Sequence, residues 1–166
     1  RSNSAVSNQI NSGSTTKAIT VTNAVPSNAK SNFYSGSFYF DGSGDYLNTN
    51  SSSDFGFGTG AFTVEAWIYP TALTSPAHYL FAFSSNDSVI GWDQSTGDLN
   101  IQLRAAGAPA LTKYKSVIVN KWQHFAVTRD GVGNVRAYLD GVLAATTTDS
   151  GDMGSSGTCT IGNRIG

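Results

Sequence analysis

Short runs of β-branched and aromatic residues, in which apolar and polar positions alternate, recur along this chain and constrain its fold most strongly. The clearest begin at Ser37 (SFYF, leading through DGSGD into YLNT), at Phe62 (FTVEAWIYP) and at Trp122 (WQHFAVTRDGVGNVRAYLDGVLA). A period of two residues indicates a half-buried strand, because successive side chains of a strand point to opposite faces. Asp140-Gly141 predicts a two-residue hairpin turn between two of these runs, since both of its positions need positive φ.

The rest of the chain repeats this pattern. Further strands are predicted at residues 17–22, 78–84, 88–93, 98–104, 111–119 and 158–162, whereas Pro26 is expected to open an irregular stretch that lasts to Gly36. No stretch of roughly ten residues keeps the 3.6-residue apolar period of a helix. Many short strands at regular spacing predict an all-β fold, an antiparallel two-sheet β-sandwich of the jelly-roll kind.

The run that starts at Phe62 carries bulky residues on both of its faces. One face would present Phe62, Val64, Ala66 and Ile68, and the other Thr63, Glu65, Trp67 and Tyr69. This pattern predicts a strand that lies between the core and a concave, partly covered surface.

Composition excludes several classes of function. Charged residues make up 13% of the chain, the formal net charge is -1, and the Lys and Arg residues are scattered, so no basic patch for nucleic acid is expected. Solubility through hydroxyl and amide groups suits an extracellular or virion-surface β protein. No run approaches the roughly 18 apolar residues of a membrane span.

Cys159 is the single cysteine, which excludes an intrachain disulfide and predicts a small buried strand residue.

In their order and separation, the three segments resemble the laminin-G-like (LamG-like) jelly-roll domains of the concanavalin A-like group. The resemblance implies a domain over residues 15–166. The polar composition of residues 1–14 predicts an arm or linker before it, with Val6 and Ile10 as apolar anchors. LamG-like domains usually continue past a segment like TCTIGNRIG into one more strand, which lies beside the first. The resemblance therefore implies that this last strand is missing. We predict that the arm, a neighbouring chain or further polypeptide covers the open edge.

Catalysis is not expected, although glucanases share this fold. Glucanases of the laminarinase type carry Glu-x-Asp-x-x-Glu on one strand, and retaining hydrolysis needs two carboxylates about 5 to 5.5 Å apart. Glu65 is the single glutamate of the chain, and no carboxylate lies two or three residues to either side of it. His124 matches a tryptophan-x-histidine pattern of the family, in which the histidine packs and forms hydrogen bonds.

Calcium is the metal that the resemblance makes a candidate, because Ca²⁺ sites are common in LamG-like and related lectin domains. Calcium takes about six to eight oxygen ligands from loops. Asp41 and Asp45, in FDGSGD, flank a glycine turn and are the first choice. The other pairs in similar positions are Asp93 with Asp98 and Asp149 with Asp152. The alternative interpretation is that each aspartate shapes its own turn by bonding to the backbone.

Sugar binding needs an aromatic plate for the apolar face of the ring, beside planar polar groups. The available groups are Trp92 with Asp93, Trp67 with Tyr69 and Glu65, and, less favoured, Tyr79 and Tyr114. Trp92 lies close to a turn and is predicted to be the best exposed plate. Trp67 and Trp122 lie in the strands that define the fold of the family, which favours a place in the core.

Together these observations favour a non-enzymatic recognition or adhesion module of a larger surface protein, such as a phage tail-fibre or virion protein or a bacterial adhesin. Its partner would be a cell-surface glycan, with calcium as an aid. The alternative is a structural or decoration protein that acts through protein–protein contacts, as part of a larger assembly or a homo-oligomer. A glycoside hydrolase is the least favoured class. The expected location is extracellular, at a cell or virion surface.

Overall fold

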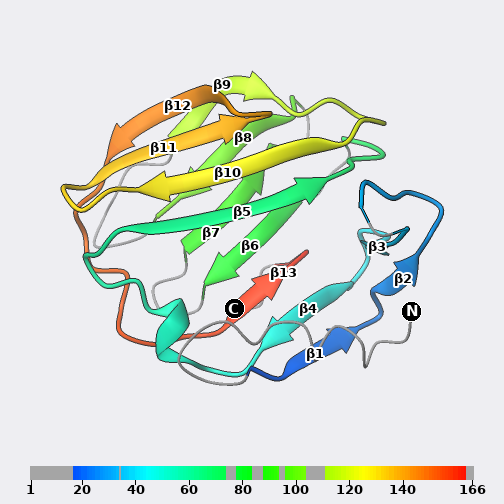
Figure 1. Ribbon diagram of the computed structural model, residues 1–166, viewed down its shortest axis with the longest axis horizontal. Helices are drawn as coiled ribbons and strands as arrows, with labels where there is room; N and C mark the ends of the chain where they lie inside the picture. The colour runs from blue at the N-terminus through cyan, green and yellow to red at the C-terminus, as the bar shows by residue number, and fades with distance from the viewer. Residues whose placement is uncertain are drawn as a thin grey trace.

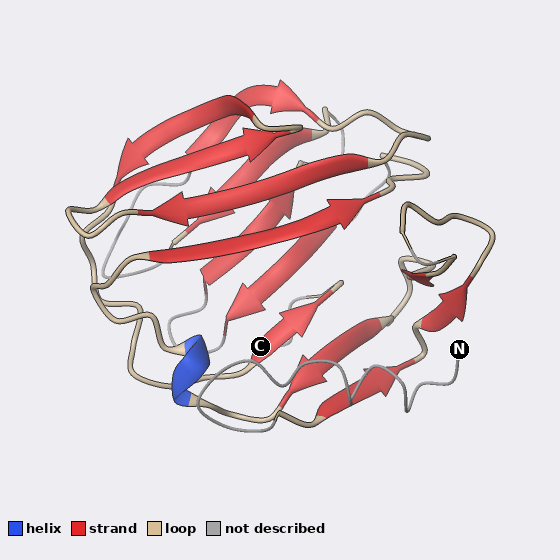
Figure 2. Ribbon diagram, in the orientation of Figure 1, coloured by secondary structure: helices blue, strands red, loops and turns tan. Residues whose placement is uncertain are grey.

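Two antiparallel sheets face each other and form a β-sandwich in this computed structural model (Figure 1). The structure describes residues 17–33, 35–73, 78–83, 88–93, 96–103 and 111–163, without the side chains of 111–115. Strands account for almost all of the regular structure (Figure 2), and the one helical element among these residues is the 3₁₀ turn η1 (Ser53–Phe55). No helix in this part of the chain has the length and apolar character needed to cross a membrane.

The larger sheet has seven strands, which pair antiparallel throughout. In spatial order they are β1 (Ile19–Thr22), β4 (Tyr46–Thr49), β13 (Cys159–Ile161), β6 (His78–Phe83), β7 (Ser88–Trp92), β8 (Asp98–Gln102) and β9 (Leu111–Ser116). β13, the last strand among the described residues, thus lies between β4 and β6, so segments distant in sequence pair within one sheet.

The smaller sheet has four strands and carries the surface on which the functional argument rests. In spatial order they are β12 (Val142–Thr148), β11 (Asn134–Leu139), β10 (Gln123–Arg129) and β5 (Phe62–Ile68). A separate two-stranded sheet pairs β2 (Val25–Ser27) with β3 (Ser37–Tyr39). This small sheet lies beyond the C-terminal end of β5 (Figure 1).

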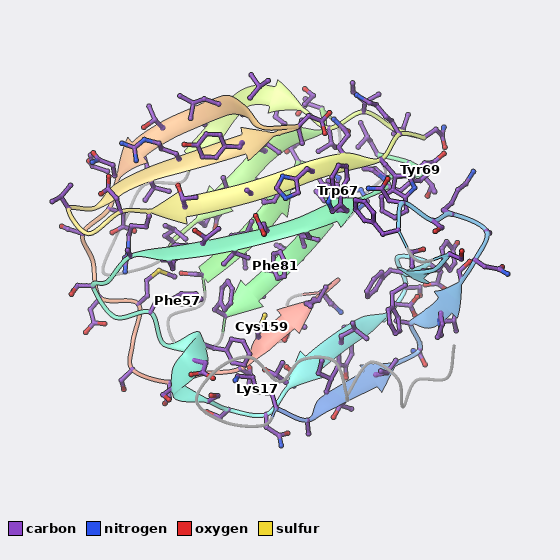
Figure 3. All side chains as sticks on the ribbon, viewed as in Figure 1. Lys17, Phe57, Trp67, Tyr69, Phe81 and Cys159 are labelled. Carbon is purple, nitrogen blue, oxygen red and sulfur yellow. The ribbon has the colours of Figure 1, made fainter. Side chains whose placement is uncertain are left out.

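The core lies between the two sheets. Its fully buried apolar side chains come from both layers: Ile90 and Ile101 from the larger sheet, and Phe125, Val127, Val135 and Leu139 from the smaller. Phe57, Phe81 and Cys159 also lie in this layer (Figure 3). Burial of each large apolar side chain contributes about 1.5 to 3 kcal/mol, so this layer dominates the stability of the domain.

The predicted fold class is confirmed. Each predicted strand is present, and its ends lie within three residues of the expected ones. The Asp140-Gly141 turn is also confirmed, with φ of 53° and 75° at its two residues. The stretch after Pro26 is the exception, because Pro26 lies inside β2 and pairs with Phe38. Proline is tolerated there since β2 belongs to a two-stranded ribbon, in which it pairs on one side only.

Buried Arg129 fixes the loop that leads into β5. Its guanidinium donates hydrogen bonds to the carbonyl oxygens of Gly60 (2.9 Å), Gly151 (2.9 Å) and Gly58 (2.7 Å). Burial lowers the pKa of Arg129, and Asp149 acts in the opposite direction. The three carbonyl acceptors satisfy the buried cation, so the loops before β5 and after β12 are held together.

Both sheets have an open edge among the described residues. β1 pairs only with β4, and β5 pairs only with β10. An open edge presents unpaired backbone donors and acceptors. The arm at residues 1–14, which we predicted to cover such an edge, lies outside the described residues, so its role stays a prediction.

Candidate functional site

The outer face of β5 brings an exposed tryptophan next to a carboxylate and an imidazole. β5 and β10 pair so that Trp67 lies opposite His124, with ring centroids 5.3 Å apart. His124 Nε2 lies 3.5 Å from Glu65 Oε2, and the Glu65 side chain is 62% exposed. Trp67 is 44% exposed, so its expected place in the core is wrong: the alternation of β5 directs it away from the other sheet.

A second aromatic pair extends this face toward the end of β5. Tyr69 contacts Trp122 edge-on, with ring centroids 5.5 Å apart. Tyr69 follows Trp67 by two residues, and Trp122 precedes His124 by two residues. The alternation of the strands therefore places all four side chains on one face. We call these four residues the aromatic ladder. Trp67 and Tyr69 lie together at the end of β5 (Figure 3).

The loop between β2 and β3 contributes to both pairs of the ladder. Phe33 lies edge-on to Trp67, with ring centroids 5.4 Å apart, and is itself 52% exposed. Lys30 Nζ lies 5.0 Å from the centroid of the Tyr69 ring. The ladder therefore has a wall built by a segment that precedes β5 by almost thirty residues.

The β11–β12 turn fixes the strand that carries half of the ladder. The backbone N–H of Asp140 donates to the His124 carbonyl oxygen (2.7 Å), and Asp140 Oδ1 accepts from the His124 N–H (2.9 Å). Asp140 Oδ2 pairs with Lys121 Nζ at 3.2 Å. The Asp-Gly turn thus does more than reverse the chain, because its carboxylate holds the first residues of β10 in place.

A polar cluster lies farther along the same sheet. Arg136 Nη1 lies 3.1 Å from Asp130 Oδ2, and Asn134 donates to both oxygens of that carboxylate. Hydrogen bonds from Asn134 lower the pKa of Asp130 to about 2, so this carboxylate stays charged at any neutral pH. The charge of Arg136 is therefore compensated within the sheet.

This arrangement has the chemistry of a sugar-binding surface. An exposed indole offers a flat apolar plate. Beside it, Glu65 accepts hydrogen bonds, and the nitrogen atoms of the His124 ring can donate or accept them. The neighbour that the structure shows for the Glu65 carboxylate is the imidazole of His124.

The other predicted ligand residues lie elsewhere. Trp92 was predicted to be exposed, and this is wrong: it is 9% exposed, shares the core-facing side of β7 with Ile90 and stacks on His78 at 5.2 Å. Tyr79 is half-buried in the neighbouring strand β6. These residues belong to the larger sheet, so the structure separates them from Glu65 and Trp67.

Asp93 has a visible structural role. Its Oδ1 accepts hydrogen bonds from the backbone N–H and the hydroxyl of Thr96, at 3.1 and 3.3 Å, and its carbonyl accepts from Gly97. The carboxylate therefore shapes the turn between β7 and β8.

The predicted calcium ligands are close together, but as parts of one turn. Asp45 Oδ2 accepts from the backbone N–H of Asp41 at 2.6 Å, and Asp41 Oδ1 accepts from that of Ser43 at 2.7 Å. Among the described residues, no group of three or more His, Cys, Asp or Glu side chains is arranged to hold a metal. These contacts fit the turn-shaping interpretation, and calcium stays a prediction.

Cys159 is buried, as predicted. It is 6% exposed, and burial raises the pKa of its thiol to about 12, so the thiol is neutral and unreactive at physiological pH.

Sequence reasoning missed the contributions of Lys30 and Phe33. Both lie in a stretch that carries no periodic signal, and their contacts with β5 exist only through the folded chain. It noted Tyr69 as a plate beside Trp67 and gave His124 a packing role. The strand register, with Trp67 opposite His124, is what places these residues in one site.

A profile of the laminin G 3 family, described as the concanavalin A-like lectin/glucanases superfamily, matches residues 41–166. The chain belongs to this family. In a comparison with curated proteins, no sequence matches it.

Several solved structures share the fold. The binding domain of Paraclostridial Mosquitocidal Protein 1 superposes with a TM-score of 0.66 at 14% identity, over 90% of this chain and 41% of that one. The receptor binding domain of botulinum neurotoxin D gives 0.66 at 16%, over 91% and 41%. Domain 4 of AbnA, a GH43 extracellular arabinanase from Geobacillus stearothermophilus in complex with arabinotriose, gives 0.64 at 14%, over 88% and 72%. This chain thus spans about two fifths of the first two structures. At these identities the likeness establishes the fold.

Proposed function

We propose that this domain is a non-enzymatic recognition module that binds carbohydrate on the outer face of its smaller sheet. The observation that carries the proposal is the exposed Trp67, which lies against His124 and beside Glu65. A sugar ring has an apolar face that stacks on an indole and equatorial hydroxyls that need hydrogen-bond partners. Trp67 would take the first role, and Glu65 with His124 the second.

The comparisons support the same class of function. The arabinanase domain that shares this fold was solved in complex with arabinotriose, and the two toxin domains are named as binding domains. Within this proposal the domain is part of a larger surface protein, such as a phage tail fibre or a bacterial adhesin, and acts outside the cell.

Because Glu65 has an imidazole as its neighbour, we expect no turnover of laminarin. Hydrolysis that disappears in Glu65→Gln would contradict the non-enzymatic assignment.

A glycan array probed with the full chain, with and without calcium, tests the proposal. We expect binding that Trp67→Ala reduces by at least about tenfold, since a stacked aromatic contributes about 1 to 3 kcal/mol. Tyr39→Ala is the matched control, because Tyr39 is 48% exposed but lies in β3 and outside the ladder. Thermal unfolding of both variants checks that they remain folded. Equal binding by the two variants would overturn the site.

A second candidate function is assembly through protein–protein contacts, which the open edges favour. β5 has seven residues and pairs on one side only among the described residues, and such an edge can accept a strand from another chain. Sedimentation of the full chain distinguishes the two functions. A stable oligomer together with a silent glycan array would favour assembly, whereas a monomer that binds glycans would favour recognition.

A further inference from the structure

We propose that Lys30 makes the aromatic ladder selective for sugars that carry a carboxylate or sulfate group. This inference rests on the proposed carbohydrate-binding function and adds the class of ligand. Lys30 comes from the loop between β2 and β3, is exposed, and places its ammonium over the Tyr69 ring.

Lys30 differs from the other cations near the ladder in the group that its charge contacts. Lys121 pairs with Asp140 at 3.2 Å, and Arg136 pairs with Asp130 at 3.1 Å. No carboxylate pairs with Lys30 in the described part of the chain, where its partner is an aromatic face. A cation held over a ring keeps its hydrogen-bond donors available, so it can receive an anionic group of a ligand.

The position of Lys30 is fixed by its own loop. The hydroxyl of Ser37, at the start of β3, donates to the carbonyl oxygen of Lys30 at 2.7 Å. Three residues farther on, Phe33 lies edge-on to Trp67. One loop therefore sets the cation at Tyr69 and an apolar wall at Trp67, and both contacts hold the loop against the ladder.

The groups that flank the two ends of the ladder differ in charge. Glu65 precedes Tyr69 by four residues on the same face of the strand, which corresponds to about 13 Å at the usual rise of a strand. The negative end lies at Glu65 and the positive end at Lys30, with Trp67 between them. A sugar stacked on Trp67 would direct its acidic group toward Lys30 and its hydroxyls toward Glu65 and His124.

A charge-assisted hydrogen bond between an ammonium and a carboxylate or sulfate is roughly twice as strong as one between neutral groups. At a partly exposed site such a bond weakens with salt, because the Debye length falls from about 10 Å at 0.1 M to about 3 Å at 1 M. The preference for acidic sugars should therefore be largest at low ionic strength.

Affinity electrophoresis of the full chain tests this inference with four polymers. Polygalacturonate carries carboxylates, chondroitin sulfate carries carboxylates and sulfates, and laminarin and arabinan are neutral. We expect the acidic polymers to bind more tightly at low salt, and Lys30→Met to weaken this binding by about tenfold, a larger loss than it causes for the neutral polymers. Since both acidic polymers carry carboxylates, tighter binding of chondroitin sulfate than of polygalacturonate would indicate a preference for sulfate.

Lys121→Met is the matched control, because it removes an equal charge that Asp140 already compensates. If Lys30→Met leaves acidic binding unchanged, or if Lys121→Met weakens it equally, the inference is wrong and the proposed function stands on neutral binding. If none of the four polymers binds and the glycan array is silent, the proposed function is wrong and this inference falls with it.

Discussion

The two faces of β5 have opposite roles, although they share one backbone. Toward the larger sheet, Phe62 and Ile68 are at most 8% exposed. Toward the outside, Trp67 is 44% exposed, and Glu65 reaches His124 on the neighbouring strand. The inner face gains its free energy from burial, and the outer face retains groups that a ligand can use.

This contrast shows that a bulky residue in a strand is not evidence of a core position. Trp92 and Trp67 lie in strands of similar length, yet the first is buried and the second exposed. The difference follows from the layers, because the core-facing side of β7 is covered by the smaller sheet, whereas the outer face of β5 is met at one end by the β2–β3 loop. The predictions below test this contrast, from the largest expected effect to the smallest.

The largest effect is expected on the inner side of the smaller sheet. Phe125 is fully buried, so Phe125→Ala should lower the free energy of unfolding by about 3 to 5 kcal/mol. Thr63→Ala, on the outer face of the neighbouring strand, should change it by no more than about 0.5 kcal/mol. Urea unfolding of both variants measures the two values. Similar losses would mean that the two faces are not as distinct as their burial indicates.

The pH dependence of stability tests how dry the inner layer is. Burial raises the pKa of Cys159 to about 12, above that of a thiol in an unfolded chain. The folded state therefore keeps the proton longer, and this contribution to stability is complete below about pH 9 and is lost as the pH rises toward 12. The loss approaches about 1.4 kcal/mol for each pH unit. In Cys159→Ala this component should vanish. Thermal unfolding of both proteins from about pH 8 to about pH 11 would detect the difference. Identical curves would show that water reaches the thiol.

The Asp-Gly turn tests the register that separates the two faces. A Cβ at Gly141 would meet no atom within 4 Å, so Gly141→Val should act through its positive φ alone. We expect a loss of about 1 to 2 kcal/mol in the free energy of unfolding. Gly131 also has open space around it but lacks positive φ, and Gly131→Val is the control, with little change. A neutral Gly141→Val would show that the turn does not set the register.

The smallest effect concerns the predicted calcium site at the turn of Asp41 and Asp45. If the turn binds calcium, EDTA should lower the thermal midpoint by a few degrees, because an ion held only by the folded state stabilises it by mass action. Asp41→Asn should remove the response to EDTA, while Asp130→Asn should retain it. A thermal midpoint that is the same with and without EDTA would leave the turn-shaping role as the whole explanation.

Much of the fold could be predicted because its signals are local. The alternation in FTVEAWIYP correctly divided the residues of β5 between two faces, and the Asp140-Gly141 pair correctly predicted the hairpin. The strand at Val25–Ser27 was missed, because a three-residue ribbon containing proline has no periodicity to detect.

The candidate site could be predicted only in part. Glu65 and Trp67 were both identified from their strand, and the structure places them together with His124. Trp92 with Asp93, and Tyr79, were also predicted as ligand residues because sugar binding needs an aromatic plate beside planar polar groups. Sequence pattern does not say which sheet a strand joins, and these residues belong to the other sheet.

The sequence by itself determined the alternation of each strand and the hairpin turn, since both depend on residues close together in the chain. It also determined the family, through the order and separation of three strand segments. Only the tertiary structure decided which tryptophan faces solvent and which loop reaches it. Exposure of Trp67 depends on the layer its face lacks, and the contacts of Phe33 and Lys30 depend on where the β2–β3 loop lies. Such contacts join residues more than thirty positions apart, and no local pattern in the chain records them.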